Sequence, residues 1–152
     1  MTKKKTITIH NSLIEQFGMK PYKLRGKEKY MSKRQLNHFK KILNSWKEQL
    51  EKEAEKTVNH MQKDSNSLAD PNDRATLESE FGLELRTRDR ERKLVRKIQS
   101  SLIKIDDGTF GYCEETGEAI GLQRLEARPV ASLTLEAQER REITEKQFND
   151  NR

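Results

Sequence analysis

The fold is decided by residues 32–64, which read SKRQLNHFKKILNSWKEQLEKEAEKTVNHMQKD. Ser32 and Gln35 have the form of a capping box, in which the serine hydroxyl accepts from a free amide of the first turn and the glutamine reaches back. Apolar residues then recur at alternating steps of three and four, on one stripe of a helix. The stripe consists of Leu36, Phe39, Leu43, Trp46, Leu50, Ala54, Val58 and Met61. This predicts one helix of about 30 to 35 residues, roughly 50 Å long.

A second helix of similar length is predicted from residues 70–73 (DPND) to residues 106–108 (DDG). Asp70 has the character of an N-cap and Pro71 that of a first helical residue. Its apolar stripe is weakened by long cations at Arg88 and Arg92. The apolar members are Leu77, Phe81, Leu85, Val95, Ile98, Leu102 and Ile105. Because a short turn at about residues 65–70 joins two helices of similar length, we expect them to lie antiparallel.

Glycines punctuate the chain after the second helix and predict a compact, turn-rich module. A last helix is predicted from about Ser132 to Phe148, and the stretch from Ile7 to Phe17 is expected to pack at the base of the hairpin. The fold class is therefore mainly α: a long antiparallel coiled-coil hairpin with a small globular module and a C-terminal helix. The expected divisions are a basic segment (1–31), the hairpin (32–105, tip at about 65–75), the module (106–131) and the final helix (132–152).

The composition supports narrow apolar seams rather than a thick core. Of the 152 residues, 37% are charged and only 32% are hydrophobic, against about 25% charged in typical domains. A large globular enzyme is excluded on this ground. The single cysteine, Cys113, excludes an intramolecular disulfide framework and fits a reducing compartment. With no long apolar run and no hydrophobic signal core, we expect a cytoplasmic protein without a membrane span.

The net charge of +6 is concentrated at the start of the chain. Residues 1–31 hold eight Lys or Arg against two Glu, and the remainder is balanced. Such a segment can bind nucleic acid through counterion release, although a basic chain start is more often a solubilising end. Nucleic-acid binding by this segment is therefore one candidate function.

A catalytic site is not evident from the residues. His10, His38 and His60 are scattered, without a partner at the spacing of a metal or nucleophile site. There is also no glycine loop of the phosphate-binding type. We therefore expect that the protein is not an enzyme.

Two charged features remain as candidate sites. Asp70 and Asp73 at the hairpin tip, beside Ala75, are explained by helix capping alone, or they form a charged probe at the end of a rod. Arg86, Arg90, Lys93 and Lys97 lie on one helix face. That stripe is either a solvated surface, with Asp89 pairing to Lys93, or a phosphate site.

Three strings carry a resemblance to a known family. They are DPNDRA at residues 70–75, ELRTRDRERKLVRKI at 84–98 and DDGTFGYCEETGEAIGLQRLEARP at 106–129. With the closing helix, they resemble the DksA, or DnaK suppressor, family of bacterial RNA polymerase-binding transcription factors. The resemblance implies a hairpin inserted through the polymerase secondary channel, with tip aspartates near the catalytic magnesium. It also implies action with the alarmone ppGpp in the stringent response, without sequence-specific DNA binding and as a monomer.

The resemblance also implies roles for individual residues. Asp70, Asp73 and Ala75 match the tip group that acts on the polymerase. Arg90, Lys97 and Arg128 match the basic positions that face ppGpp and polymerase, and Leu94 matches a polymerase contact. A further position that is usually basic is Gln138 here, and an amide does not replace a cation against phosphate.

The four zinc-ribbon cysteines of many family members fall here at Cys113, Thr116, Thr134 and Ala137. One thiolate and two hydroxyls do not make a tetrahedral structural zinc site, so the chain resembles a cysteine-poor, zinc-less branch. We expect no zinc and a degenerate ribbon-like module held by packing. The expected core residues of that module are Leu122, Leu125, Val130, Leu133 and Leu135.

The predicted function is regulation of promoter open complexes by direct binding to RNA polymerase. The resemblance implies negative control of ribosomal RNA promoters and positive control of some amino acid biosynthesis promoters. A structural coiled-coil adaptor, in which Asp70 and Asp73 serve only as caps, is the main alternative.

Overall fold

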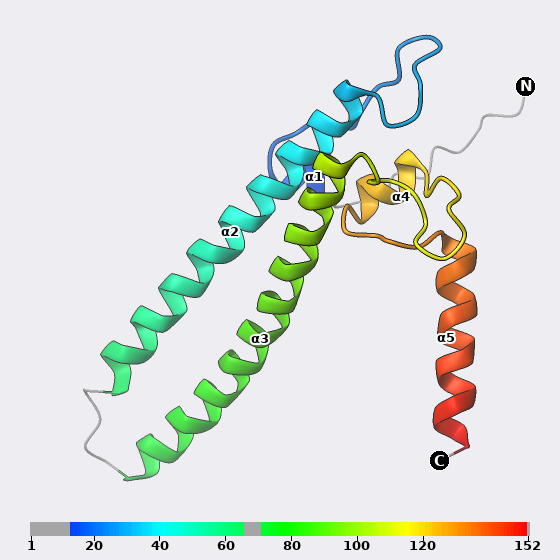
Figure 1. Cartoon of the computed structure of the whole chain (residues 1–152). Coiled ribbons are helices and arrows are strands. Elements are labelled where there is room, and N and C mark those ends of the chain that lie inside the picture. Colours follow the sequence, from blue (N-terminus) through cyan, green and yellow to red (C-terminus); the bar gives the residue numbers. More distant parts are fainter. Residues whose placement is uncertain (1–12, 66–70, 152) are drawn as a thin grey trace, which may run out of the picture.

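The computed structural model describes residues 13–65 and 71–151, and its architecture is a long helical hairpin with a small module at one end (Figure 1). Helices α2 (Lys33–Ser65) and α3 (Pro71–Asp107) form the two antiparallel arms. The short helices α1 (Leu13–Gln16) and α4 (Leu122–Ala127) lie at the base, and α5 (Leu135–Asp150) extends from the module. The predicted fold class is confirmed, and both arms begin and end close to the predicted residues.

Helix α2 begins at the predicted capping box, with one change in its hydrogen bonds. The Ser32 hydroxyl accepts from the backbone N–H of Gln35 at 3.4 Å. The side-chain oxygen of Gln35 accepts from the N–H of Met31 at 2.7 Å, one residue before the expected donor. The reason is that the N–H of Ser32 is already bonded to the carbonyl of Lys29 at 3.2 Å. Gln35 is fully buried by this arrangement.

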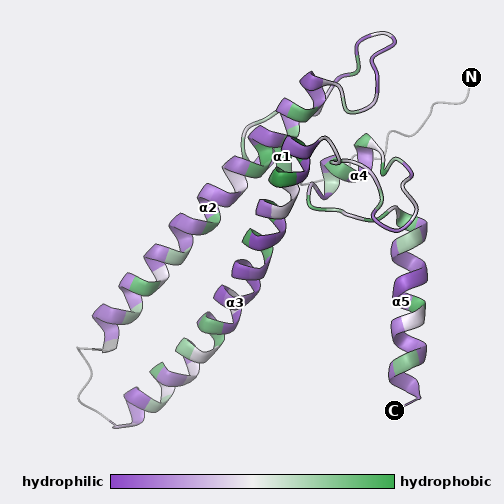
Figure 2. Ribbon diagram, in the orientation of Figure 1, coloured by the Kyte–Doolittle hydropathy of each residue, from purple (hydrophilic) through white to green (hydrophobic). Residues whose placement is uncertain are grey.

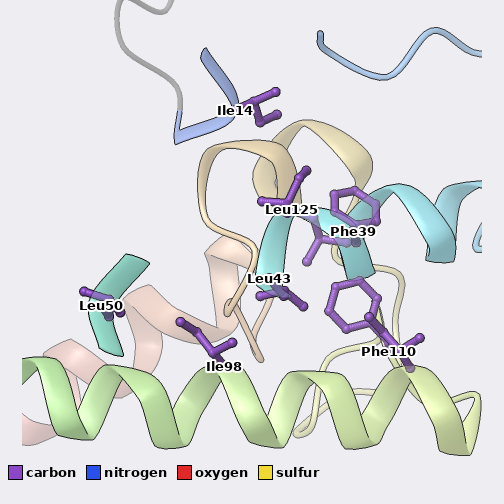
Figure 3. Close-up of a cluster of buried hydrophobic side chains, with 9 residues drawn as sticks. Ile14, Phe39, Leu43, Leu50, Ile98, Phe110 and Leu125 are labelled. Atoms are coloured by element: carbon purple, nitrogen blue, oxygen red, sulfur yellow. The ribbon is translucent and has the colours of Figure 1, made fainter. Parts of the chain in front are cut away.

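The hydrophobic core sits at the base of the hairpin, where both arms meet α1, α4 and the module (Figure 3). The rings of Phe39 from α2 and Phe110 from the module lie 5.5 Å apart within it. Because the module and the second arm both cover the base of α2, its buried face there is wider than a single seam. The buried members are Ile14, Phe39, Ile42, Leu43, Leu50, Ile98, Ile105, Phe110 and Leu125.

The distal half of the hairpin is held by a thinner and more polar seam than the sequence stripe predicted. On α3 the inward track with steps of three and four runs through Glu84, Arg88 and Glu91, all half-buried, and Arg88 pairs with Glu91. Leu85 lies one position off this track and is 58% exposed, and Arg92 is also exposed. Their predicted seam positions were therefore wrong.

The same one-residue offset occurs on α2. Val58 is exposed while its neighbour Thr57 is half-buried. The apolar residue that the stripe assigned to the seam thus faces solvent, because the heptad track passes through Thr57.

The module between α3 and α5 is turn-rich, as predicted, and its described residues contain one isolated antiparallel bridge, Tyr112 to Ala119. Gly108, with φ of 77°, directly follows the end of α3, a conformation that glycine adopts at little cost. Leu125 and Leu133 are buried as expected, and Leu122 and Val130 are half-buried. Leu135 is 54% exposed, so its predicted place in the core was wrong.

The chain before the hairpin packs where the sequence predicted, over the part that the structure describes. Ile14 of α1 is fully buried in the core with Leu125 of α4. The carbonyl of Ile14 accepts from the N–H of Met19 at 3.0 Å. Residues 7–12 of the predicted packing segment lie outside the described residues.

Helix α5 is anchored at its first turn. The Thr134 side chain caps it by accepting from the N–H of Ala137 at 3.3 Å, and Ala137 is its one buried residue. The rest projects away from the module, and Figure 2 shows mainly hydrophilic residues along α5 and both arms. Among the described residues, no helix is long and apolar enough to cross a membrane.

Candidate functional site

The hairpin tip presents an exposed acid at the start of α3. Pro71 opens the helix, and Asp73 lies in its first turn, where a carboxylate is favoured by the helix dipole. Asp73 and Ala75 are both exposed. Asp70 lies outside the described residues. With a rise of 1.5 Å per residue, Asp73 stands about 50 Å from the base of the hairpin.

A cationic cleft of about 400 Å³ lies at the opposite end, between the base of α3, the segment before α5 and α5 itself. Five basic residues line it together with two acids, Glu114 and Glu145. The cations come from α3, α4, the segment between α4 and α5, and α5. They are Lys97, Lys104, Arg124, Arg128 and Arg141.

The cleft brings together some of the residues assigned by the family resemblance and separates others. Lys97, Arg128 and Gln138 line it together, although they are far apart in sequence. Arg90 does not line it, and instead borders a shallow groove on α3 with Leu83 and Leu85. Leu94 is half-buried against the main core, so only part of its side chain is available to a partner.

The other cations of the cleft are already engaged within the protein. Lys104 forms an ion pair with Glu114, and Arg141 pairs with Glu145 at 3.7 Å. The Arg124 guanidinium donates from Nε to the carbonyl of Leu133 at 3.0 Å.

Lys97 and Arg128 are the cations of the cleft that form no ion pair in the part of the chain that the structure describes. Within residues 13–65 and 71–151, neither has an acidic partner. The Gln138 side chain beside them donates to Glu142 at 2.9 Å. Lys97 and Arg128 are therefore the pair best placed to receive an anion, because binding there breaks no existing ion pair.

Sequence reasoning missed three cations of the cleft. Lys104 follows Lys97 by two helical turns, so the basic stripe could have been extended to it. Arg124 and Arg141 carry no such signal, since their place depends on how α4 and α5 fold back on α3. The predicted pairing of Asp89 with Lys93 is confirmed at 3.4 Å, outside the cleft.

The four positions that correspond to zinc-ribbon cysteines lie together around the buried Cys113 thiol. The Thr134 hydroxyl lies 3.9 Å from its Sγ, and Ala137 packs in the same small cluster. Burial acts to raise the pKa of Cys113, but hydrogen bonds from the Thr116 hydroxyl and from nearby backbone N–H groups lower it to about 6. In the described part of the chain, no three His, Cys, Asp or Glu side chains group as metal ligands. The residues present thus do not fit structural zinc.

Two family models match the chain. Residues 35–105 match the N-terminal domain of the DnaK suppressor protein DksA, and residues 108–142 match the prokaryotic dksA/traR C4-type zinc finger. The second match covers the module in which only Cys113 remains of the four cysteines.

Individual relatives are similar over most of their length. The RNA polymerase-binding transcription factor DksA of Haemophilus influenzae is 53% identical over 136 residues, covering 90% of this chain and 94% of the relative. The protein of the same name from Escherichia coli K12 is 49% identical over 137 residues, covering 90% and 91%. The solved structure of transcription factor DksA2 from Pseudomonas aeruginosa superposes with a TM-score of 0.71 at 37% identity, covering 77% of this chain and 90% of that one.

Proposed function

The chain belongs to the DksA family, and we propose that it is a transcription factor that binds bacterial RNA polymerase directly. The observation that carries this proposal is the combination of family membership over 90% of the chain with an exposed acid, Asp73, held at the far end of a long helical rod. A rod of this shape delivers a charge to a site that the rest of the protein does not reach.

In the proposed mechanism, the hairpin enters the polymerase secondary channel and places its tip near the catalytic magnesium. Asp70, Asp73 and Ala75 act there, and the base of the hairpin remains outside. A bound protein shifts the lifetime of the promoter open complex only by as much as its affinity differs between polymerase states. The proposed outcome is negative control of ribosomal RNA promoters and positive control of some amino acid biosynthesis promoters.

The cationic cleft is the proposed contact for ppGpp at the polymerase interface. Lys97 and Arg128 supply two cations that form no ion pair with the described residues, and charge-assisted hydrogen bonds to phosphate are among the stronger polar contacts. Arg90 and the exposed part of Leu94 are assigned to the polymerase side, because Arg90 lies outside the cleft.

The remaining proposals concern zinc, enzymatic activity, oligomeric state, location and DNA recognition. The module needs no zinc, the protein has no enzymatic activity, and it acts as a monomer in the cytoplasm without reading DNA sequence. The packing of Leu125, Leu133 and Cys113 supports a module that folds without metal.

Co-purification with RNA polymerase core enzyme tests the proposal, combined with open-complex decay on a ribosomal RNA promoter with and without ppGpp. We expect the protein to bind core enzyme and to shorten the open-complex lifetime. A structural adaptor predicts neither result. A chain that binds core enzyme but leaves open-complex decay unchanged at every ppGpp concentration would refute the regulatory function.

A further inference from the structure

The cleft contains an acid that holds one of its own cations. Glu114 lines the cleft and forms an ion pair with Lys104. The backbone N–H of Glu114 donates to the carbonyl of Ser132, another cleft residue, at 2.9 Å. This hydrogen bond holds the backbone of Glu114 in the wall of the cleft, so the position of the acid does not depend only on its flexible side chain.

Lys104 would otherwise extend the anion site. It lies two turns after Lys97 on α3, or about 10 Å along the helix axis, and both line the same cleft. Gln138 supplies no cation, and Lys104 is the second cation that α3 contributes to the cleft. Its charge is neutralised in the free protein by Glu114.

We propose that Glu114 is an internal competitor that sets the anion affinity and selectivity of the cleft by occupying Lys104. This inference rests on the proposed role of the cleft as the ppGpp contact. A ligand gains Lys104 only by displacing the Glu114 carboxylate, so a singly charged anion gains little by the exchange. A ligand with multiply charged phosphate groups displaces it more readily, since its oxygens carry more charge than one carboxylate. The cleft therefore selects diphosphate-bearing ligands over monocarboxylates.

The test compares Glu114→Gln with a matched control, Glu115→Gln. Glu115 is the adjacent exposed acid and does not line the cleft, so its change removes the same charge from the same acidic run. For each variant in complex with polymerase, the half-maximal ppGpp concentration for the protein-dependent change in open-complex lifetime is measured. We expect Glu114→Gln to lower that concentration about three- to tenfold by freeing one charge-assisted contact, and Glu115→Gln to leave it within about twofold.

A double-variant cycle tests whether Glu114 acts on anion binding through Lys104. Adding Glu114→Gln to a Lys104→Ala chain should give no gain over Lys104→Ala alone. An equal gain from Glu114→Gln and Glu115→Gln, or a gain that persists without Lys104, would overturn the inference while leaving polymerase binding intact. If the wild-type chain does not bind polymerase, the proposed function is wrong. Titration of the free chains with inorganic pyrophosphate, read by isothermal calorimetry, then decides the role of Glu114 by the same comparison.

Discussion

The Tyr30 hydroxyl donates a hydrogen bond to the carbonyl of Gly111 at 2.7 Å, across 81 residues of sequence. The same hydroxyl accepts from the N–H of Gly121 at 3.0 Å. One side chain before the first arm thus satisfies two backbone groups of the module. Gly111 is also in close contact with Met31, because a Cβ at this glycine would lie 2.7 Å from the Met31 sulfur.

Tyr30→Phe should lower the free energy of unfolding by about 1–3 kcal/mol, because it leaves the Gly121 N–H without its acceptor. It also removes one of the two donors to the Gly111 carbonyl, which still accepts from the Ile120 N–H at 2.9 Å. Urea denaturation followed by circular dichroism measures the loss. Tyr112→Phe is the matched control, since Tyr112 is exposed and its ring contacts the Tyr30 ring at 5.6 Å. Equal stability losses in the two variants would show that the Tyr30 hydroxyl has no special role.

Asp73→Asn tests the tip. The change removes one charge from the first turn of α3 and should cost only about 0.3–1 kcal/mol of stability through the helix dipole. Binding to polymerase should be retained, and the effect on open-complex lifetime should be mostly lost. Glu78→Gln, an exposed acid further along the same arm, should keep full regulation. Normal binding with normal regulation by Asp73→Asn would contradict the delivered-charge mechanism.

Lys97→Ala tests the base. It should weaken the ppGpp-dependent part of regulation more than the ppGpp-independent part, because a phosphate contact of roughly 1.5–3 kcal/mol is lost. Titration of ppGpp against polymerase with each variant measures the difference. Lys93→Ala serves as the control, since Lys93 is held by Asp89 outside the cleft. A uniform loss at every ppGpp concentration would assign Lys97 to polymerase contact alone.

The sequence predicts the elements of this fold better than their inward faces. Both arms were predicted close to their ends because capping residues and an apolar period act locally. Leu85 and Val58 were misassigned because the seam keeps its heptad phase through Glu84, Arg88 and Thr57, which a search for apolar residues passes over. Ile42 was missed as a core residue because it lies beside the predicted stripe, on a part of α2 where the core also includes residues from α1, α4 and the module.

The candidate site follows the same division. The stripe ending at Lys97 was visible in the helical spacing of α3. The cleft was not, because its other walls come from α4, α5 and the segment between them, whose orientation depends on tertiary packing. Arg90 lies outside the cleft for the same reason. The basic stripe on α3 extends toward the hairpin tip beyond the residues that the module covers.

Metal independence is the next expectation. Of the four positions that hold zinc-binding cysteines in many relatives, Thr134 and Ala137 occupy two. The Thr134 hydroxyl is hydrogen-bonded to the Cys113 thiol, and Ala137 packs beside it. The purified protein should therefore contain no stoichiometric zinc. A chelator should leave its thermal unfolding unchanged, and Cys113→Ser should remain folded at a modest cost, because a buried thiol packs as a small hydrophobe. Elemental analysis checks the first point. About one zinc per chain, lost together with the fold on chelation, would contradict the expectation.

Stability should fall as the pH is lowered through about 6.5, because of the protonation of His38. Burial lowers the pKa of His38 below its ordinary value of 6.5, and the Glu126 carboxylate, 3.6 Å away, only partly opposes this. The folded protein therefore binds fewer protons than the unfolded chain below pH 6.5. The stabilisation that comes from keeping His38 neutral is fully present above pH 6.5. It is lost as the pH falls through the lowered pKa of His38 in the folded protein.

Urea denaturation across this pH window should show a shallower pH dependence for His38→Gln. His60→Gln is the control, because His60 is an exposed residue of the first arm. If His38→Gln and the wild-type chain have the same slope, protonation of His38 does not control acid stability.

The confinement of the buried core to the base of the hairpin divides the chain by its tolerance to mutation. Beyond Leu50 on α2 and before Ile98 on α3, the described residues of the arms contain no fully buried apolar side chain. Substitutions at the exposed positions there cost little folding energy, whereas those at the base remove core packing. In a saturation library sorted for soluble expression, the exposed positions of the distal arms should therefore tolerate nearly any amino acid. When the same library is sorted for promoter control, few substitutions should be tolerated at the tip. The positions required for folding and those required for regulation should therefore lie at opposite ends of the same two helices.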